Sequence, residues 1–407
     1  MYRRLFCVTT ASSGAMIAMK SLHQNSVLAQ VLAGRNLTKS DIPTPALLVD
    51  LDAFEANVQK MAGHCRATNL GTRPHAKTHK CPEIAKRQIA AGAVGICVAT
   101  VPEAEALAAA GIDNILLTSP IVDVGKMTRI VDLASKRQRK IMLSVGHKRQ
   151  VDLLTQVAAQ ANVQLDVLID LDVGDRRTGI LPGAPAVELA QHVSRSKQLT
   201  VRGVQAYAGF ASHVAGFEKR SQTSREALAL AVQTKQMLLQ AGFDAQILSG
   251  GSTGTYNIDS QISGMTELQV GSYIFMDVSY RAIGGQDGGA IYTDFQPSLT
   301  VLATVVSNTH AGRVSIDAGT KGLDTTTTSV PEVKNAPHLV YAKAGDEFGA
   351  LTSDSSARLP EIGDRLELIV PHCDPSINLY DRLYACRGEI IEAIWPITAR
   401  RETATQS

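Results

Sequence analysis

Eight short apolar segments recur between residues 71 and 273, and longer amphipathic segments separate most of them. We expect the short segments to be strands, because each is a brief apolar run bounded by turn-forming residues. Strands that alternate with helices form right-handed crossovers and a parallel sheet. Eight such units predict an α/β protein with a (β/α)8 TIM-like barrel, with a doubly wound open sheet as the alternative. The strands are expected at 71–77, 95–100, 114–119, 140–145, 164–172, 201–207, 245–250 and 267–273.

The pattern changes past residue 283, where β-like segments follow one another with few helical stretches between them. Turns rich in Gly, Asp, Asn and Pro join these segments, which is typical of a mainly β domain. Strands are expected at 299–309, 313–319, 338–344, 364–370, 381–388 and 390–397. An early strand at 46–52 precedes the barrel. We therefore expect the barrel at 53–283 and the C-terminal mainly-β domain at 41–52 together with 284–400.

Residues 1–40 form an N-terminal extension and residues 401–407 a tail, and both are left out of the fold prediction. Arg3 and Arg4 precede a mildly apolar stretch from Leu5 to Met19, which resembles a degenerate twin-arginine export signal. The stretch is also rich in Ser and Thr, and Lys20 follows it. We therefore expect a cytoplasmic protein, with export to the periplasm as the alternative.

The charge of the chain excludes two classes of partner. Forty basic and 38 acidic residues give a net charge of +2, and no block of one sign stands out. A nucleic-acid or membrane-surface protein would carry such a block. No run of 18 apolar residues occurs, so no membrane span is expected.

The segment "RPHAKTHK" at 73–80 places Lys77 at the end of the first predicted barrel strand. Functional residues of a parallel barrel lie at the C-terminal ends of its strands, so the amine would point into the barrel mouth. Among basic neighbours part of the amine could be deprotonated and nucleophilic. The alternative is an ordinary solvated lysine in a turn.

Two glycine-rich segments end the seventh and eighth predicted strands, "SGGSTGTY" at 249–256 and "VGSY" at 270–273. Glycines allow backbone N–H groups to approach a ligand closely, and phosphate sites in such barrels commonly form after strands seven and eight. The alternative is a pair of ordinary loops. A lysine opposite a phosphate cup predicts pyridoxal phosphate, with Lys77 as its Schiff-base partner.

The segment "VPHCDPSINLYD" at 370–381 carries His372 and Asp374 two positions apart. In an extended segment both would face one side and could share a divalent metal, with Cys373 pointing away. The alternative is a turn, since Asp-Pro favours one. Arg176 or Arg177, after the fifth strand, could reach a cofactor oxygen, and Tyr207, after the sixth, could contact the cofactor ring.

Seven segments together resemble one known family. They read "TPALLVDLDAFEANV", "RPHAKTHK", "DVGDRRTG", "QAYAG", "GGSTGTY", "GSYIFMD" and "PHCDP". They are similar to segments of the D-threonine aldolase and D-serine dehydratase family, which are fold-type III pyridoxal phosphate enzymes related to alanine racemase. The resemblance covers about residues 40–400 and implies an alanine racemase-like fold.

The resemblance also implies roles for individual residues. Lys77 matches the Schiff-base lysine, and His372 and Asp374 match the metal pair, with His372 as the base. The implied cofactor contacts are Lys77, Arg177, Tyr207, Ser252, Thr253, Gly254, Thr255, Gly271, Ser272 and Tyr273. The dehydratase branch tends to carry cysteine where Asp374 stands, which favours the aldolase. Phe348 stands where a related segment often carries histidine, so specificity could differ.

The activity implied is that of a D-threonine aldolase, a lyase dependent on pyridoxal phosphate and a divalent metal. It would cleave D-threonine and related D-3-hydroxy amino acids to glycine and an aldehyde, with Mn²⁺ as the expected metal and Mg²⁺, Co²⁺ or Zn²⁺ as others. The runner-up is a D-serine or D-threo-3-hydroxyaspartate dehydratase, which would release a keto acid and ammonia. A third hypothesis is a non-catalytic carrier of pyridoxal phosphate, against which the β domain argues. Relatives of this fold pair head to tail, so a homodimer is expected.

Overall fold

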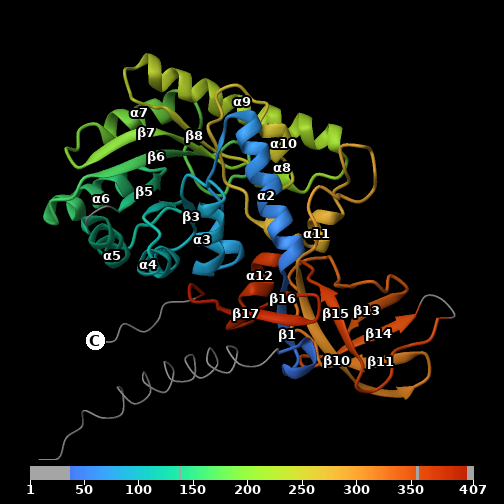
Figure 1. The fold of residues 1–407 in the computed structure, drawn as a ribbon. Coiled ribbons are helices and arrows are strands. Elements are labelled where there is room, and N and C mark those ends of the chain that lie inside the picture. The colour runs from blue at the N-terminus through green and yellow to red at the C-terminus, as the bar shows by residue number, and fades with distance from the viewer. Residues whose placement is uncertain (1–36, 137–138, 354–356, 401–407) are drawn as a thin grey trace, which may run out of the picture.

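The computed structural model describes residues 37–136, 139–353 and 357–400, which form two units joined side by side (Figure 1). Residues 1–36, which include the stretch considered as an export signal, lie outside the described residues. The tail at 401–407 lies outside them as well. No helix in the described part of the chain combines the length and the apolar character needed to cross a membrane.

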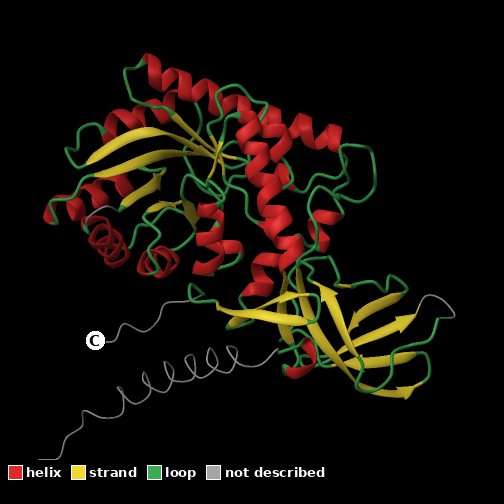
Figure 2. Ribbon diagram, viewed as in Figure 1, coloured by secondary structure: helices red, strands yellow, loops and turns green. Residues whose placement is uncertain are grey.

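The first unit is a parallel eight-stranded sheet curved into a barrel, as Figure 2 shows. Neighbours run in the order β2-β9-β8-β7-β6-β5-β4-β3. A parallel bridge between His75 and Cys97 joins the two ends of the sheet and closes it. The (β/α)8 prediction is therefore confirmed. The strands are β2 (Gly71–Thr72), β3 (Ile96–Val98), β4 (Asn114–Leu117), β5 (Lys140–Val145), β6 (Leu165–Leu171), β7 (Leu199–Ala206), β8 (Ile247–Gly250) and β9 (Glu267–Leu268).

The first and last barrel strands are much shorter than the sequence suggested. Pro74 interrupts the predicted strand at 71–77, and the chain turns into the 3-10 helix η2 (Ala76–Thr78). Proline has no N–H to give to a ladder, which explains the early end of β2. Likewise β9 gives way to η3 (Ser272–Ile274). Both turns lie at the mouth of the barrel, where they carry Lys77 and Ser272.

A buried ion pair ties these two short strands together inside the barrel. The guanidinium of Arg73 donates from Nε to Oε1 of Glu267 at 2.8 Å and from Nη2 to Oε2 at 3.0 Å. Both side chains are buried. Loss of one partner would leave a buried charge unpaired, which destabilises the folded protein by about 3–5 kcal/mol. The pair therefore stabilises the seam of the barrel where the strand ladders are shortest.

Helices cover the outside of the barrel and begin at recognisable caps. Thr100 accepts a hydrogen bond from the N–H of Glu103 at the start of α4, and Asp123 accepts one from Lys126 at the start of α5. Such caps satisfy N–H groups that the helix leaves without partners. The helices are α2 (Leu51–Thr68), α3 (Pro82–Ala90), α4 (Val101–Ala109), α5 (Val124–Ser135), α6 (Lys148–Gln160), α7 (Ala184–Val193), α8 (Gly209–Ser212), α9 (Phe217–Gln240), α10 (Tyr256–Asp259) and α11 (Val278–Arg281).

The second unit is a mostly antiparallel nine-stranded sheet in the order β11-β14-β13-β12-β15-β10-β1-β16-β17. The early strand β1 lies inside this sheet, antiparallel to β10 and parallel to β16. Two strands that the sequence did not suggest, β12 and β14, complete the sheet. Its strands are β1 (Ala46–Asp50), β10 (Leu299–His310), β11 (Arg313–Ile316), β12 (Glu332–Val333), β13 (Leu339–Lys343), β14 (Gly349–Ser353), β15 (Arg365–Ile369), β16 (Arg382–Arg387) and β17 (Ile390–Pro396).

The two units meet at the barrel mouth. The N–H groups of Val278 and Ser279 in α11 each donate to a carbonyl just after β15, at Val370 and Pro371. The next residues form the short helix α12 (Cys373–Ile377), which Figure 1 shows between the barrel and the second sheet. The chain following β15 is thereby held against the C-terminal ends of the barrel strands.

Candidate active site

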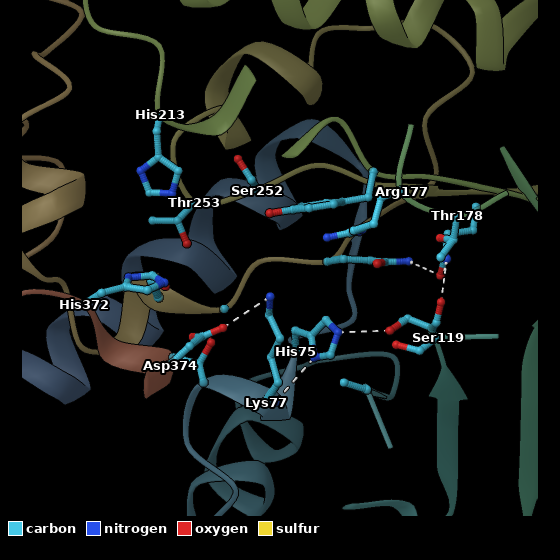
Figure 3. A pocket seen from close by; sticks show the side chains of 18 of the residues that line it. His75, Lys77, Ser119, Arg177, Thr178, His213, Ser252, Thr253, His372 and Asp374 are labelled. Atoms are coloured by element: carbon cyan, nitrogen blue, oxygen red, sulfur yellow. Dashed lines mark hydrogen bonds and ion pairs between the residues drawn. The ribbon is translucent and has the colours of Figure 1, made fainter. Parts of the chain in front are cut away.

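A cavity of about 350 Å³ lies at the barrel mouth, between the strand ends and α12 (Figure 3). It brings together most of the residues singled out in the sequence. Those that line it are Lys77, Arg177, Tyr207, Ser252, Thr253, Gly271, Ser272, His372 and Asp374. Three predicted contacts, Gly254, Thr255 and Tyr273, do not line the cavity and lie behind its wall.

Lys77 extends from η2 into the cavity. Its Nζ lies 3.2 Å from Oδ2 of Asp374 and 6.0 Å from the ring centroid of Tyr207. Burial lowers the pKa of Lys77, but the negative charge of Asp374 more than offsets this, so the pKa lies above its ordinary value. The expectation that basic neighbours would free the amine of its proton is therefore wrong for this structure, because a carboxylate is the closest charged group.

The other basic residues of the "HAKTHK" segment serve the turn itself. His75 caps η2, since its Nδ1 accepts the N–H of Lys77 at 3.3 Å, and Nδ1 of His79 accepts the N–H of Cys81 at 3.0 Å. Burial lowers the pKa of both imidazoles, that of His79 to about 3, so both are neutral. The amine of Lys80 donates to the carbonyl of Lys77 at 2.6 Å. Three polar side chains thus fix the backbone that carries Lys77.

His372 and Asp374 lie at the start of α12 rather than in an extended segment. His372 is the N-cap residue, with extended backbone angles, and Asp374 is the second residue of the helix. The prediction of a strand-like H-x-D was wrong in this respect, because the chain turns into a helix immediately after His372. Both side chains still reach the same cavity. Cys373 is fully buried, away from it.

Asp277, which the sequence analysis did not single out, holds His372 in place. Its buried carboxylate accepts from Nδ1 of His372 at 2.8 Å and from the N–H of Cys373 at 3.0 Å. Burial lowers the pKa of His372, but the hydrogen bond and the negative charge of Asp277 raise it by more than burial lowers it. The pKa of His372 therefore lies above its ordinary value. With Nδ1 engaged, Nε2 is the atom of His372 left to meet a ligand.

The residues present could hold a cation through two protein ligands at most. Among the described residues, no three His, Cys, Asp or Glu side chains come together as a metal site. Oδ1 of Asp374 is buried without a well-formed hydrogen bond in this part of the chain. Burial raises the pKa of Asp374, but Lys77, His372 and the nearby Thr78 hydroxyl bring it down to about 2. Its carboxylate is thus ionised, with the Lys77 ammonium as the cation beside it.

The wall opposite Asp374 is built from the loops after β8 and β9. The N–H of Tyr273 donates to the Thr253 hydroxyl at 3.0 Å, which joins the two loops. A Cβ at Gly271 would lie 2.5 Å from the Thr78 hydroxyl, so only glycine fits between this wall and η2. Ser252 and Thr253 both line the cavity, and the N–H and hydroxyl of Ser252 contact the Thr255 hydroxyl. A glycine-rich turn with hydroxyl side chains is typical of an anion site.

Of the two adjacent arginines, Arg177 belongs to the cavity. Its guanidinium lies 5.2 Å from the ring centroid of Tyr207, within the range of a cation–π contact. Arg176 does not line the cavity and has a left-handed backbone with φ of 52°.

Several lining residues carry no sequence signal of their own. They are His75, Thr118, Ser119, Thr178, Gln205, His213, Gln269 and Tyr280. His213 is the most relevant, because its ring centroid lies 6.1 Å from that of His372. Burial lowers the pKa of His213, which leaves the imidazole neutral. The only signal that could have found it is its place in the loop after β7, among other strand-end residues.

Two family models match the chain. Residues 49–279 match the alanine racemase N-terminal domain, and residues 298–386 match a putative serine dehydratase domain. The D-threonine aldolase of Arthrobacter sp. is 38% identical over 88% of this chain and 93% of its own. The 3-hydroxy-D-aspartate aldolase of Paracoccus denitrificans (strain Pd 1222) is 32% identical over 89% of this chain and 94% of its own.

This chain belongs to the D-threonine aldolase and D-serine dehydratase family. The two aldolases compared above are lyases, and this chain is a lyase as well. The hypothesis of a non-catalytic carrier of pyridoxal phosphate is therefore rejected. The solved D-threonine aldolase of Filomicrobium marinum matches with a TM-score of 0.85 at 35% identity, over 90% of this chain and 98% of its own. A metal-free cysteine-to-alanine mutant of a D-threo-3-hydroxyaspartate dehydratase matches with a TM-score of 0.79 at 25% identity. The match covers 88% of this chain and 98% of the dehydratase chain. The alanine racemase-like fold, a barrel followed by a β domain, is thereby confirmed.

Proposed function

We propose that this chain is an aldolase that cleaves D-threonine and related D-3-hydroxy amino acids to glycine and an aldehyde, with pyridoxal phosphate and a divalent metal. One observation carries the proposal. A single cavity holds a lysine amine, a glycine-rich wall suited to an anion, and an imidazole beside a carboxylate. Aldolases are also the more similar of the relatives compared, at 38% and 32% identity.

The described residues fit pyridoxal phosphate. Lys77 is the amine that would hold it, Ser252, Thr253 and Ser272 would hold its phosphate, and Arg177 would pair with one of its oxygens. The absence of room for a side chain at Gly271 keeps this wall close against η2, the turn that carries Lys77. When bound, the cofactor supplies an electron sink for the electrons of the broken Cα–Cβ bond.

His372 and Asp374 would hold a divalent cation: Asp277 engages Nδ1 of His372, which leaves Nε2 as the ligand atom, and Oδ1 of Asp374 is buried without a hydrogen-bond partner among the described residues. Mn²⁺ and Mg²⁺ prefer sites with oxygen ligands and retained waters, which suits a pair of protein ligands better than a closed zinc site. When bound, the cation lowers the pKa of the substrate hydroxyl. Mn²⁺ remains the metal of choice in this proposal, with Mg²⁺, Co²⁺ and Zn²⁺ as others.

The proton of the substrate hydroxyl needs an acceptor at this end of the cavity. His372 is the proposed base acting through a water, because Asp277 engages its Nδ1 and the cation would occupy its Nε2. His213 is the second imidazole near it, and its neutral ring could take the proton while Nε2 of His372 holds the cation. Lys77, on the opposite side of Asp374, stays available for the cofactor.

The dehydratase remains the second candidate, because residues 298–386, which include His372 and Asp374, match a putative serine dehydratase domain. The same cavity would then remove the Cα proton with Lys77, and the hydroxyl would leave. Asp374 in place of cysteine favours the aldolase.

The proposal also includes a homodimer and a cytoplasmic location. It includes the domain boundaries as well, with the barrel at 53–283 and the β domain at 284–400 together with 41–52.

The experiment is a product analysis of protein loaded with pyridoxal phosphate and Mn²⁺. D-Threonine should give glycine and acetaldehyde in equal amounts, while L-threonine should give neither. D-Serine, tested in parallel, should give no pyruvate and ammonia. Absence of glycine and acetaldehyde from D-threonine would reject the aldolase, and rapid release of pyruvate from D-serine would favour the dehydratase.

A further inference from the structure

Arg220 is the largest side chain that is completely buried in the described part of the chain. It lies in the first turn of α9, behind the glycine-rich wall of the cavity and outside the cavity itself. Buried charges are normally paired with an opposite charge, because an isolated charge is costly to remove from water.

Every hydrogen bond of this guanidinium goes to a neutral backbone carbonyl. Nε donates to Gly254 at 2.8 Å, Nη1 to Val214 at 2.9 Å and Ile283 at 2.8 Å, and Nη2 to Gly284 at 2.9 Å. No carboxylate of the described residues lies within ion-pair distance of it. An arginine stays charged under these conditions. The carboxylate of Asp294 acts on this guanidinium only from beyond ion-pair distance, so a positive charge without a direct ion-pair partner lies behind the loop at 252–255.

The same loop is anchored from this side at a second carbonyl. The hydroxyl of Tyr292 donates to the carbonyl of Thr253 at 2.9 Å, and the Tyr292 ring lies 5.8 Å from the Arg220 guanidinium. The C=O and the N–H of a trans peptide point in opposite directions. Because the Thr253 carbonyl is held toward Tyr292, the N–H of Gly254 is turned to the opposite side of the loop, where Ser252 and Thr253 line the cavity.

The packing around Gly254 leaves no room for a side chain. A Cβ at this position would lie 2.1 Å from the carbonyl oxygen of Ser212 and 3.1 Å from a methyl group of Ile283. The loop is therefore packed between α8, the segment at 283–284 and Arg220. The N–H of Gly254 is thereby set in place before any ligand binds, which is the requirement for a preorganised anion site.

We infer that Arg220 is a positioning residue for the phosphate of the cofactor: it sets the 252–255 loop and supplies the positive charge that the phosphate neutralises from the other side. This inference rests on the proposed use of pyridoxal phosphate. It predicts that the chain distinguishes pyridoxal phosphate from pyridoxal partly through a residue that touches neither. Arginine suits the task because one rigid fork reaches three chain segments at once.

The test compares the dissociation constants of pyridoxal phosphate and pyridoxal for the apoprotein, by absorbance titration, in wild type, Arg220→Met and Arg220→Lys. In Arg220→Met, pyridoxal phosphate should bind roughly ten- to a hundredfold more weakly, because the loop loses the charge behind it and the hydrogen bonds that hold it. Binding of pyridoxal should change less than about threefold. Arg220→Lys keeps the charge but loses the fork, so its loss should be smaller. Arg225→Met, an exposed arginine of the same helix, is the matched control and should bind both as wild type does.

The ratio of the two dissociation constants separates this role from a purely structural one. If both ligands weaken equally in a folded variant, Arg220 only joins the three segments and the inference is overturned. If Arg220→Met does not fold by circular dichroism, the ratio measured for Arg220→Lys decides in the same way. A wild-type protein that binds no pyridoxal phosphate would instead reject the proposed function, before any variant is compared.

Discussion

The amine of Lys77 and the carboxylate of Asp374 form an ion pair with 3.2 Å between Nζ and Oδ2, although one follows the first barrel strand and the other lies in a helix after β15. The pair spans the barrel mouth from the first unit to the second. Neither unit alone contains both the amine and the imidazole–carboxylate couple. The proposed chemistry therefore depends on how the two units pack together.

Replacement of Lys77 by alanine should abolish attachment of the cofactor. Borohydride treatment of wild type loaded with pyridoxal phosphate should label one peptide, the one containing Lys77, and the label should be absent from Lys77→Ala. Aldol cleavage should fall at least about a thousandfold, because the covalent route is lost. Lys86→Ala, on the exposed face of α3, is the control and should keep both label and activity. A label on any other lysine in wild type would contradict the assignment.

Replacement of Asp277 by asparagine should weaken metal binding without affecting pyridoxal phosphate. The carboxylate that fixes Nδ1 of His372 would be gone, and partners of this kind are typically worth 10–100-fold in metal affinity. Titration with Mn²⁺ checks this directly. The chain offers a matched control in Asp152, whose carboxylate accepts from His192 at 2.6 Å far from the cavity. Equal loss in Asp277→Asn and Asp152→Asn would show that the effect is general.

Replacement of Asp374 by cysteine should change which metal the couple prefers. A thiolate is a softer ligand than a carboxylate and favours Zn²⁺ over Mn²⁺. In a competition measured by elemental analysis, Asp374→Cys should take up Zn²⁺ preferentially, whereas wild type should retain more Mn²⁺. Asp374→Asn, which lacks the negative charge, should bind both weakly. An unchanged metal preference in the cysteine variant would argue against Asp374 as a ligand.

Asp259 makes the stability of the apoprotein depend on pH. Its buried carboxyl accepts from Ser224 and Thr255, but burial raises its pKa from 3.8 to about 6. The folded protein therefore binds this proton more tightly than the unfolded chain, and the stabilisation is complete below pH 4. It is lost as the pH rises to about 6, by on the order of 2–3 kcal/mol.

The melting temperature of wild type minus that of Asp259→Asn should thus decrease between pH 4 and 6 and level off above. The amide cannot ionise, so the variant lacks this transition. Asp132→Asn, at an exposed position of α5, corrects for general effects of removing a carboxylate. A difference that stays flat over this range, or that rises with pH, would contradict the raised pKa.

The barrel could be predicted from the sequence because the alternation of short apolar segments with amphipathic helical segments is a local pattern. Each strand and helix is visible in the residues that form it. The sequence also predicted the loops at the strand ends, since turns at 249–256 and 270–273 need glycine. The length of β2 and β9 was overestimated, because Pro74 and the 3-10 turns depend on how the barrel closes. β14 was missed because Gly349 and Ala350 are residue types that strands disfavour, although its partner β13 immediately precedes it along the chain.

The candidate site was predictable only in part. The glycine loops, the lysine and the H-x-D couple stand in short segments with a recognisable residue pattern. Asp277 and Arg220 act on those segments from other elements, and nothing in their neighbourhood along the chain marks them. The pKa of Lys77 was expected to fall because its neighbours in sequence are basic. In space its closest ion-pair partner is Asp374, which lies far from it along the sequence.

The most direct test of this account is a crystal structure of the protein grown with pyridoxal phosphate and Mn²⁺, with anomalous data collected at the manganese edge. The account predicts continuous density from Lys77 to the cofactor, phosphate density against Ser252 and Thr253, and an anomalous peak between His372 and Asp374 in the same cavity. A cofactor attached to another lysine, or a metal bound well away from His372 and Asp374, would contradict it.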